Sequence, residues 1–317
     1  RIILLDSAHI QEEDAKYANK KGFSKHEPAL PLYNTDDALK AIDLFHPVDI
    51  EKPLKIGKRL TVQFHEAGHI LGSTSIEVHC GPNGQDGKFL LSGDIGRYGA
   101  PILPDPAGGY DVDWAVMEST YGGRYHSDSD IINELGKVVN ESIERGGVLL
   151  IPAFAVGRTQ LLLFALRHLK DQKIIPNLPI YIDSPMAIQV TGTHVRHQEA
   201  WDIESRYMGQ KGDEPLLPDN LHVHRSVNES KQLNNVRENA IIISASGMVT
   251  GGRILHHMFN KLPVKENTVL FIGYQAFGTR GRTIQEGQPR VKIHGQEVPV
   301  KAAVRSIDGF SAHADQD

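Results

Sequence analysis

Between residues 130 and 272, the sequence alternates short apolar segments with longer segments rich in helix formers. Such alternation is typical of strands joined by helical crossovers, which place parallel strands in one sheet with helices on both faces. We therefore predict a doubly wound parallel sheet in this part of the chain. Its strands are expected at residues 148–152, 180–182, 239–244 and 268–272, and its helices at residues 130–145, 159–169, 253–260 and from 188 onward.

The segments on either side of this region have a different character. The turn signal Gly81-Pro82-Asn83-Gly84 separates two strand-like segments, which predicts an antiparallel hairpin. The whole pattern indicates an α/β unit inserted into a mixed, β-rich unit. In the flanking parts we expect strands at residues 1–6, 54–64, 75–80, 88–92 and 113–118, helices at 11–21 and 35–45, and short strands after residue 289.

The composition limits the classes of protein that the chain can represent. Its 317 residues are 40% hydrophobic and 23% charged, with a formal net charge of −5, so a nucleic-acid partner would need a local basic groove. The one cysteine, Cys80, excludes an internal disulfide and suits a reducing cytoplasm. No apolar run approaches the roughly 18 residues of a membrane span. We expect a cytoplasmic protein without a membrane partner.

Three residues at strand-to-loop junctions are candidate metal ligands. His69 follows Ala67-Gly68, Asp94 follows Ser92-Gly93, and His313 lies in the segment Ser311-Ala-His-Ala-Asp. Imidazole and carboxylate ligands suit Zn²⁺, Mn²⁺ or Fe²⁺. The alternative is that His69 is an exposed loop histidine and Asp94 an ordinary turn former. The spacing of the three is not a motif in itself.

Glu118 ends another apolar strand. Its carboxylate could orient a histidine or transfer a proton, or it could be a turn or helix-capping acid. The pair His256-His257 lies on an expected helix, where adjacent side chains point about 100° apart. The two rings cannot face one metal, so we expect a structural or surface role for them.

Three strand-to-helix loops are candidate phosphate sites, at residues 152–160, 244–253 and 273–282. Small residues at a helix start expose backbone N–H groups that bind phosphate, and the carboxyl ends of parallel strands meet at one edge of a sheet. The candidate groups are Arg158, Ser246, Gly247, Arg253 and Arg280, with Arg282 nearby. The alternative is that the glycines only permit tight turns.

Taken together and in this order, these segments resemble the β-CASP branch of the metallo-β-lactamase superfamily, which contains RNA-processing nucleases. The matching pieces are residues 67–73, 92–94, 118–122, 152–158, 246–253, 273–275 and 310–315. The resemblance implies an α/β fold, in which an incomplete αββα-type metallo-β-lactamase sandwich carries an inserted, doubly wound β-CASP domain. It also implies the boundaries: residues 1–123 and 289–317 for the sandwich and 124–288 for the insertion.

The resemblance also implies roles for the candidate residues. His69, Asp94 and His313 would be ligands of a two-zinc site that Asp94 bridges, and Glu118 would be the acidic motif residue beside it. The Ser246-Gly247 turn and Arg253, together with Arg158 and Arg280, would hold RNA phosphates. The implied activity is zinc-dependent hydrolysis of the phosphodiesters of single-stranded RNA, by exo- or endonuclease action. A homodimer is also compatible with the resemblance.

Two departures from the family pattern affect the expected activity. The signature His-x-His-x-Asp-His does not occur in these 317 residues, and Thr283 stands near the position where some relatives have a histidine. We therefore expect an N-terminally truncated catalytic domain that binds metal weakly or not at all and has little activity. The alternatives are a non-catalytic RNA-binding scaffold, against which the three retained ligands argue, and a small-molecule metallohydrolase, which would not need the inserted unit.

Overall fold

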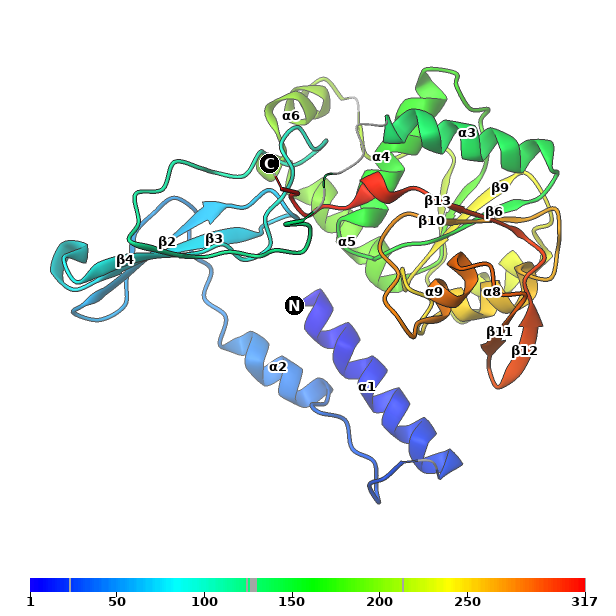
Figure 1. Cartoon of the computed structure of the whole chain (residues 1–317), viewed down its shortest axis with the longest axis horizontal. Helices are drawn as coiled ribbons and strands as arrows, with labels where there is room; N and C mark the ends of the chain where they lie inside the picture. The colour runs from blue at the N-terminus through cyan, green and yellow to red at the C-terminus, as the bar shows by residue number, and fades with distance from the viewer. Residues whose placement is uncertain (23, 124, 126–129, 213, 317) are drawn as a thin grey trace. The chain divides into compact units, whose positions relative to one another are not determined.

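The computed structural model describes residues 1–22, 24–123, 125, 130–212 and 214–316. It divides into two compact units, Arg1–Asp49 and Ile50–Asp317. The first unit contains two helices, α1 (Ile2–Lys21) and α2 (Thr35–Asp43) (Figure 1). The predicted strand at residues 1–6 is wrong, because these residues form the first turns of α1. A short apolar run fits a strand or a helix. Here the helix formers that follow the run favour a helix, and α1 includes the run from Ile2 onward.

The connection between α1 and α2 is held by side chains of α1. The backbone N–H of Leu32 donates to Gln11 Oε1 (3.0 Å), and that of Thr35 donates to Glu12 Oε1 (2.8 Å). Asn34 caps α2: its side chain accepts from the Asp37 N–H, and the Asp37 carboxylate accepts in return from the Asn34 N–H.

The second unit begins with a five-stranded sheet in the order β1-β2-β3-β4-β5. All neighbours are antiparallel except β4 and β5, which confirms the predicted hairpin of β3 and β4. Because β2, β4 and β5 run in the same direction, the loops that follow them leave the same edge of the sheet. The strands are β1 (Leu54–Lys55), β2 (Leu60–Glu66), β3 (Thr74–Cys80), β4 (Gly87–Leu91) and β5 (Trp114–Val116).

A six-stranded parallel sheet follows, in the order β13-β10-β6-β9-β7-β8 (Figure 1). The predicted doubly wound sheet is confirmed. Its strands are β6 (Val148–Pro152), β7 (Ile180–Ile182), β8 (Leu221–Val223), β9 (Ala240–Ser244), β10 (Thr268–Phe271) and β13 (Ala303–Ser306). The helices are α3 (Ile131–Glu144), α4 (Arg158–Asp171), α5 (Pro185–Arg196), α6 (Ile203–Gln210), α7 (Val227–Gln232), α8 (Ile254–Lys261) and α9 (Arg280–Gln285).

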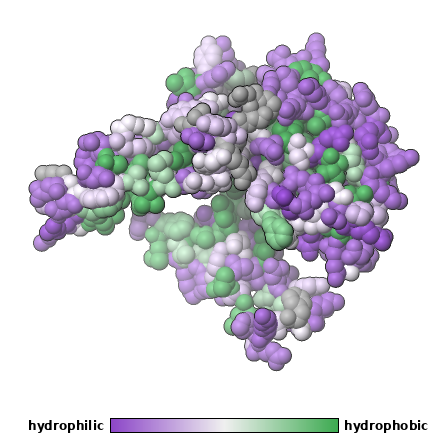
Figure 2. Space-filling model, in the orientation of Figure 1, coloured by the Kyte–Doolittle hydropathy of each residue, from purple (hydrophilic) through white to green (hydrophobic). Residues whose placement is uncertain are grey.

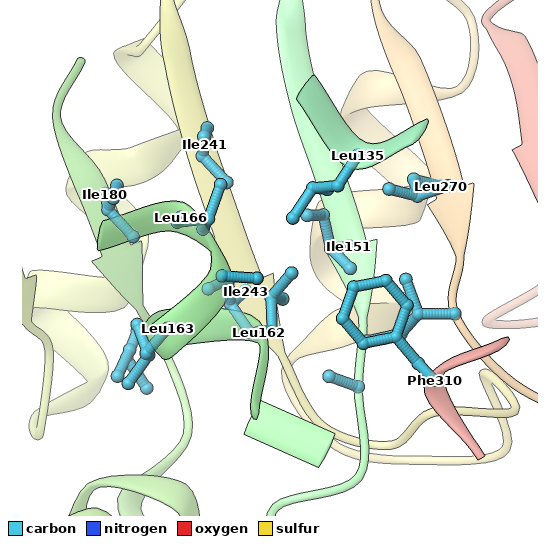
Figure 3. Close-up of a cluster of buried hydrophobic side chains, with 14 of the residues drawn as sticks. Leu135, Ile151, Leu162, Leu163, Leu166, Ile180, Ile241, Ile243, Leu270 and Phe310 are labelled. Carbon is cyan, nitrogen blue, oxygen red and sulfur yellow. The ribbon is translucent and has the colours of Figure 1, made fainter. Parts of the chain in front are cut away.

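The core lies on both faces of the parallel sheet, as the alternation of side chains along each strand requires. On β6, Leu149 and Ile151 pack into one cluster with α3 and α4 (Figure 3), whereas Val148 and Leu150 pack into a second cluster with α8. Outward-facing positions around this sheet are mainly hydrophilic in the view of Figure 2. Burial on both faces explains why the strands appear in the sequence as unbroken apolar runs.

The last segment of the chain takes part in the parallel sheet. A small hairpin of β11 (Arg290–Ile293) and β12 (Gln296–Pro299) precedes β13, which pairs with β10 at the sheet edge. The predicted boundaries at residues 123/124 and 288/289 stay predictions, and residue 124 lies outside the described residues. No helix in the described part of the chain has the length and hydrophobicity that a membrane span needs.

Candidate metal centre and nucleic-acid interface

The structure brings the three predicted metal ligands together. One ligand atom from each of His69, Asp94 and His313 lies within 4.8 Å of the others. His69 Nε2 is 3.9 Å from Asp94 Oδ2, and the rings of His69 and His313 have their centroids 4.4 Å apart. His69 follows β2 and Asp94 follows β4, so both leave the same edge of the five-stranded sheet.

A close approach of two backbones sets the distance between the His69 turn and the Asp94 turn. The Gly96 N–H donates to the Ala67 carbonyl (2.7 Å), and a Cβ at position 96 would lie 2.0 Å from the Gly68 carbonyl oxygen. Only glycine fits at position 96 without moving one of the turns. The C-terminal segment joins them through the Ala314 N–H, which donates to the Ile95 carbonyl (2.8 Å). Backbone contacts thus position all three ligands.

Glu118 orients His313. Both carboxylate oxygens of Glu118 lie 3.0 Å from His313 Nδ1. The same carboxylate accepts from the backbone N–H of Ile95 (2.7 Å), next to Asp94. With Nδ1–H donating to a carboxylate, Nε2 of His313 keeps the lone pair that a metal needs. This geometry favours the interpretation that Glu118 orients a histidine over the alternative that it is a turn or helix-capping acid.

The charges around the site favour ligand-competent protonation states. Burial lowers the pKa of His69, and repulsion from His313 lowers it further, so its imidazole is held neutral. Burial opposes ionisation of Glu118, but the hydrogen bonds from His313, Thr120 and Ile95 outweigh it and hold its pKa below the usual range. A neutral imidazole can coordinate a metal, and an ionised carboxylate can orient a histidine ligand.

The three ligands fit a zinc-type ion by their chemistry. At Zn–N and Zn–O distances of about 2.0–2.1 Å, tetrahedral ligand atoms lie roughly 3.3 Å apart. The observed 3.9 Å between His69 Nε2 and Asp94 Oδ2 is within reach of a small side-chain adjustment. Catalytic zinc sites typically use three protein ligands and keep one position open.

Beside His313 lies a cavity of about 390 Å³. Arg158 lines it, and its guanidinium donates to the Ile272 carbonyl (2.7 Å) and to Ser311 Oγ (3.4 Å). Burial lowers the pKa of Arg158 to about 10, which still leaves it cationic at neutral pH. The lining residues are Thr120, Tyr121, Phe154, Arg158, Met248, Tyr274, Ser311 and His313.

The three predicted phosphate loops follow β6, β9 and β10, which are neighbours in the parallel sheet, so the predicted convergence on one edge is confirmed. The loops contact each other directly: Gln275 donates through Nε2 to the Gly247 carbonyl (3.0 Å), and the Gly281 N–H donates to the Met248 carbonyl (3.1 Å). They form one connected surface at this edge.

Comparisons with known proteins identify the family of the chain. The Beta-Casp domain family matches residues 159–284. The chain is similar to Ribonuclease TTHA0252 of Thermus thermophilus, with 35% identity over 296 residues that cover 89% of this chain and 67% of that protein. The chain belongs to the β-CASP branch of the metallo-β-lactamase superfamily. This family is metal-dependent.

Two archaeal relatives match most of the chain. The Transcription termination factor FttA of Methanocaldococcus jannaschii is 31% identical over 322 residues, 97% of this chain and 48% of that protein. FttA of Pyrococcus abyssi is 33% identical over 299 residues, 90% of this chain and 45% of that protein. The chain spans about half the length of these archaeal relatives.

Within the β-CASP part, Arg253 is engaged by the protein itself. Its guanidinium pairs with Asp183 (2.7 Å) and donates to the carbonyls of His224 (3.0 Å) and Arg225 (2.6 Å). His257 Nε2 lies 2.6 Å from the second Asp183 oxygen. The expected structural role of His257 is confirmed, and a phosphate contact by Arg253 stays a prediction that these contacts do not support.

The other predicted phosphate contacts also stay predictions. Ser246 Oγ accepts from the Thr250 N–H (3.0 Å), which orders the turn after β9. A Cβ at Gly247 would lie 2.8 Å from Cδ2 of Phe154, so this glycine makes room for an aromatic ring. Arg280 donates to the carbonyls of Lys292 (2.8 Å) and Thr250 (3.1 Å). Arg158 is the predicted arginine that reaches the cavity beside His313.

Asp183 was not among the residues predicted from the sequence, although, like Asp94, it is an aspartate at the end of a strand. Asp183 directly follows β7, at the same sheet edge as the three loops. It is fully buried, and His257, Arg253 and Ser230 bind its carboxylate. It fixes the strand end rather than facing the cavity.

Proposed function

We propose that this chain carries part of the catalytic centre of a metal-dependent ribonuclease that hydrolyses phosphodiesters of single-stranded RNA. One observation supports this most: His69, Asp94 and His313, from segments up to 244 residues apart (313 − 69), converge within 4.8 Å, with Glu118 holding the third ligand. The names of the relatives, a ribonuclease and archaeal transcription termination factors, agree with action on RNA.

The residues of this chain would divide the work as follows. A bound metal supplies Lewis-acid chemistry and activates water. His69, Asp94 and His313 hold that ion, and Glu118 keeps His313 in the tautomer that presents Nε2. Arg158 lies in the cavity beside His313, where its fixed positive charge attracts the phosphate next to the one cleaved.

The finer features belong to the same proposal. Zn²⁺ is the ion that two imidazoles and one carboxylate suit best, and in the complete site two ions would share Asp94 as the bridging ligand. The chain itself supplies three ligands, for which we expect weak binding. We still expect a cytoplasmic protein without a membrane partner. A homodimer stays compatible with the family resemblance.

The competing function is a scaffold that binds RNA without cleaving it. The full natural protein, supplied with Zn²⁺ or Mn²⁺, is incubated with end-labelled single-stranded RNA. We expect cleavage that EDTA abolishes and that His313→Ala reduces by at least 100-fold, while His26→Ala, which changes an exposed histidine of the other unit, does not. RNA binding without metal-dependent cleavage would favour the scaffold and contradict the proposal.

A further inference from the structure

Two aromatic side chains face outward from adjacent strand ends beside the candidate metal centre. Phe154 follows β6 and is 38% exposed, and Tyr274 follows β10 and is 56% exposed. Both stand between buried neighbours: Ala153 and Ala155 are 1% and 4% exposed, and Gln275 is 2% exposed. Each segment therefore exposes one large ring between buried neighbours.

The two rings line the same cavity. β10 and β6 are neighbours in the parallel sheet, with Val269 opposite Leu150, so the segments that follow these strands leave the same edge of the sheet. Phe154 and Tyr274, one from each segment, both line the cavity beside His313.

The cavity beside His313 joins the rings to charged groups. Phe154, Tyr274 and Met248 line it together with Arg158 and His313. The ring of Phe154 rests on the backbone of Gly247, where a Cβ would lie 2.8 Å from its Cδ2, so the ring has a fixed support on one side. Single-strand binding sites are built from aromatic rings and a nearby cation, and this cavity has two rings, Phe154 and Tyr274, together with Arg158.

We infer that Phe154 and Tyr274 form a stacking platform for an unpaired nucleobase of the RNA next to the cleaved phosphate. This inference rests on the proposed function and adds the side chains that would make the site select single-stranded over double-stranded RNA. A base that stacks on either ring must first unstack from the adjacent bases of the RNA. A base in a duplex cannot do so without breaking its base pair. Stacking does not discriminate strongly among bases, so the platform gives strand selectivity with little sequence preference.

The test measures equilibrium binding of fluorescently labelled single-stranded RNA to the full chain, with EDTA present to prevent cleavage. The variants are Tyr274→Ala, Tyr274→Phe and Phe154→Ala. Phe277→Ala is the matched control, because Phe277 lies in the same loop, is 94% exposed and does not line the cavity. We expect Tyr274→Ala and Phe154→Ala to weaken binding by about 5- to 150-fold, and Tyr274→Phe and Phe277→Ala by less than about 2-fold.

A second arm identifies the base as the group that is bound. The oligonucleotides in this arm each lack the base at one position. At one position, loss of the base should weaken binding to the wild type but should not weaken binding to Tyr274→Ala any further. If Tyr274→Ala and Phe154→Ala both bind as the wild type does, the platform is refuted while the proposed function stands. If the wild type binds no single-stranded RNA, both are refuted. Should Phe154→Ala unfold, the pair Tyr274→Ala and Tyr274→Phe decides alone.

Discussion

Replacing Asp183 with asparagine tests whether the buried charge cluster holds the ends of the parallel strands. The Asp183 side chain is 0% exposed, its two oxygens face Arg253 (2.7 Å) and His257 (2.6 Å), and Ser230 Oγ donates to it as well (2.5 Å). Asparagine keeps the size of the side chain but removes its charge. It leaves Arg253 without its anionic partner, and its amide N–H₂ cannot accept from His257 or Ser230.

The size of the effect follows from the burial of each partner. Removing one member of a buried ion pair costs about 3–5 kcal/mol, because the other charge stays desolvated. Arg253 is 19% exposed and keeps its bonds to the carbonyls of His224 and Arg225, which relieves part of that cost. We therefore expect Asp183→Asn to lower the free energy of unfolding by about 3 kcal/mol at pH 7.

The dependence on pH gives an independent check. Burial opposes ionisation of Asp183, but its bonds to His257, Ser230 and Arg253 lower its pKa below 3.8. A depressed folded-state pKa gives stability that is present above the unfolded-state pKa and lost as the pH falls through the folded value. The difference in stability between wild type and Asp183→Asn should therefore be constant above about pH 5 and shrink below about pH 4.

Urea unfolding measures the effect, and Asp219→Asn is the control. Asp219 also pairs with a cation, Lys170, but its side chain is 68% exposed. Solvent screens an exposed pair of this kind, so the control should change little. A loss below about 1 kcal/mol for Asp183→Asn, or one no larger than that of Asp219→Asn, would refute this reasoning.

Three further predictions concern the core and the site. Leu166→Ala removes a fully buried side chain of α4 and should cost about 2–5 kcal/mol in urea unfolding; a cost below 1 kcal/mol would contradict the packing of Figure 3. Gly96→Ala should weaken zinc binding at least 10-fold, measured by competition with a chelating dye, because its Cβ would lie 2.0 Å from the Gly68 carbonyl oxygen; unchanged affinity would show that this contact does not position the ligands. Burial lowers the pKa of His194 to about 4, whereas an unfolded histidine has a pKa of about 6.5. Between these two pH values the unfolded chain binds the proton more readily than the folded one. The free energy of unfolding should therefore fall by roughly 3 kcal/mol as the pH drops from about 6.5 to about 4. This loss of stability at low pH should be smaller in His194→Leu than in the wild type. An equal dependence of stability on pH in the two proteins would contradict the prediction.

The sequence predicted the parallel sheet well because burial on both faces leaves a clear mark. Residues 148–152 and 239–244 are apolar at nearly every position, since β6 and β9 are covered on both sides. The strand β8 (Leu221–Val223) has no such mark, because it is a three-residue edge strand with two exposed positions. The helix at residues 2–5 was missed for the opposite reason: a short apolar run fits either structure.

The candidate site was predicted in its residues but not in its contacts. His69, Asp94 and Glu118 each follow a strand, a signal that sequence carries, whereas the contact of Gly96 with Gly68 that spaces them depends on the folded backbone. Arg253 looked available for phosphate because its partner Asp183 is 70 residues away in the chain. The outward turn of Phe154 and Tyr274 likewise emerges only when their neighbours are seen to be buried.

Zinc-binding measurements on single-residue variants test directly whether His69, Asp94 and His313 form a metal centre. Zn²⁺ titration of the metal-free chain, followed by competition with a chelating dye, gives the number of sites and their affinity. We expect one weak site, which His69→Ala or His313→Ala weakens at least 10-fold and Glu118→Gln weakens about 10- to 100-fold, while His26→Ala leaves it unchanged. Equal zinc affinity in the wild type, His69→Ala and His313→Ala would show that these residues do not form a metal centre.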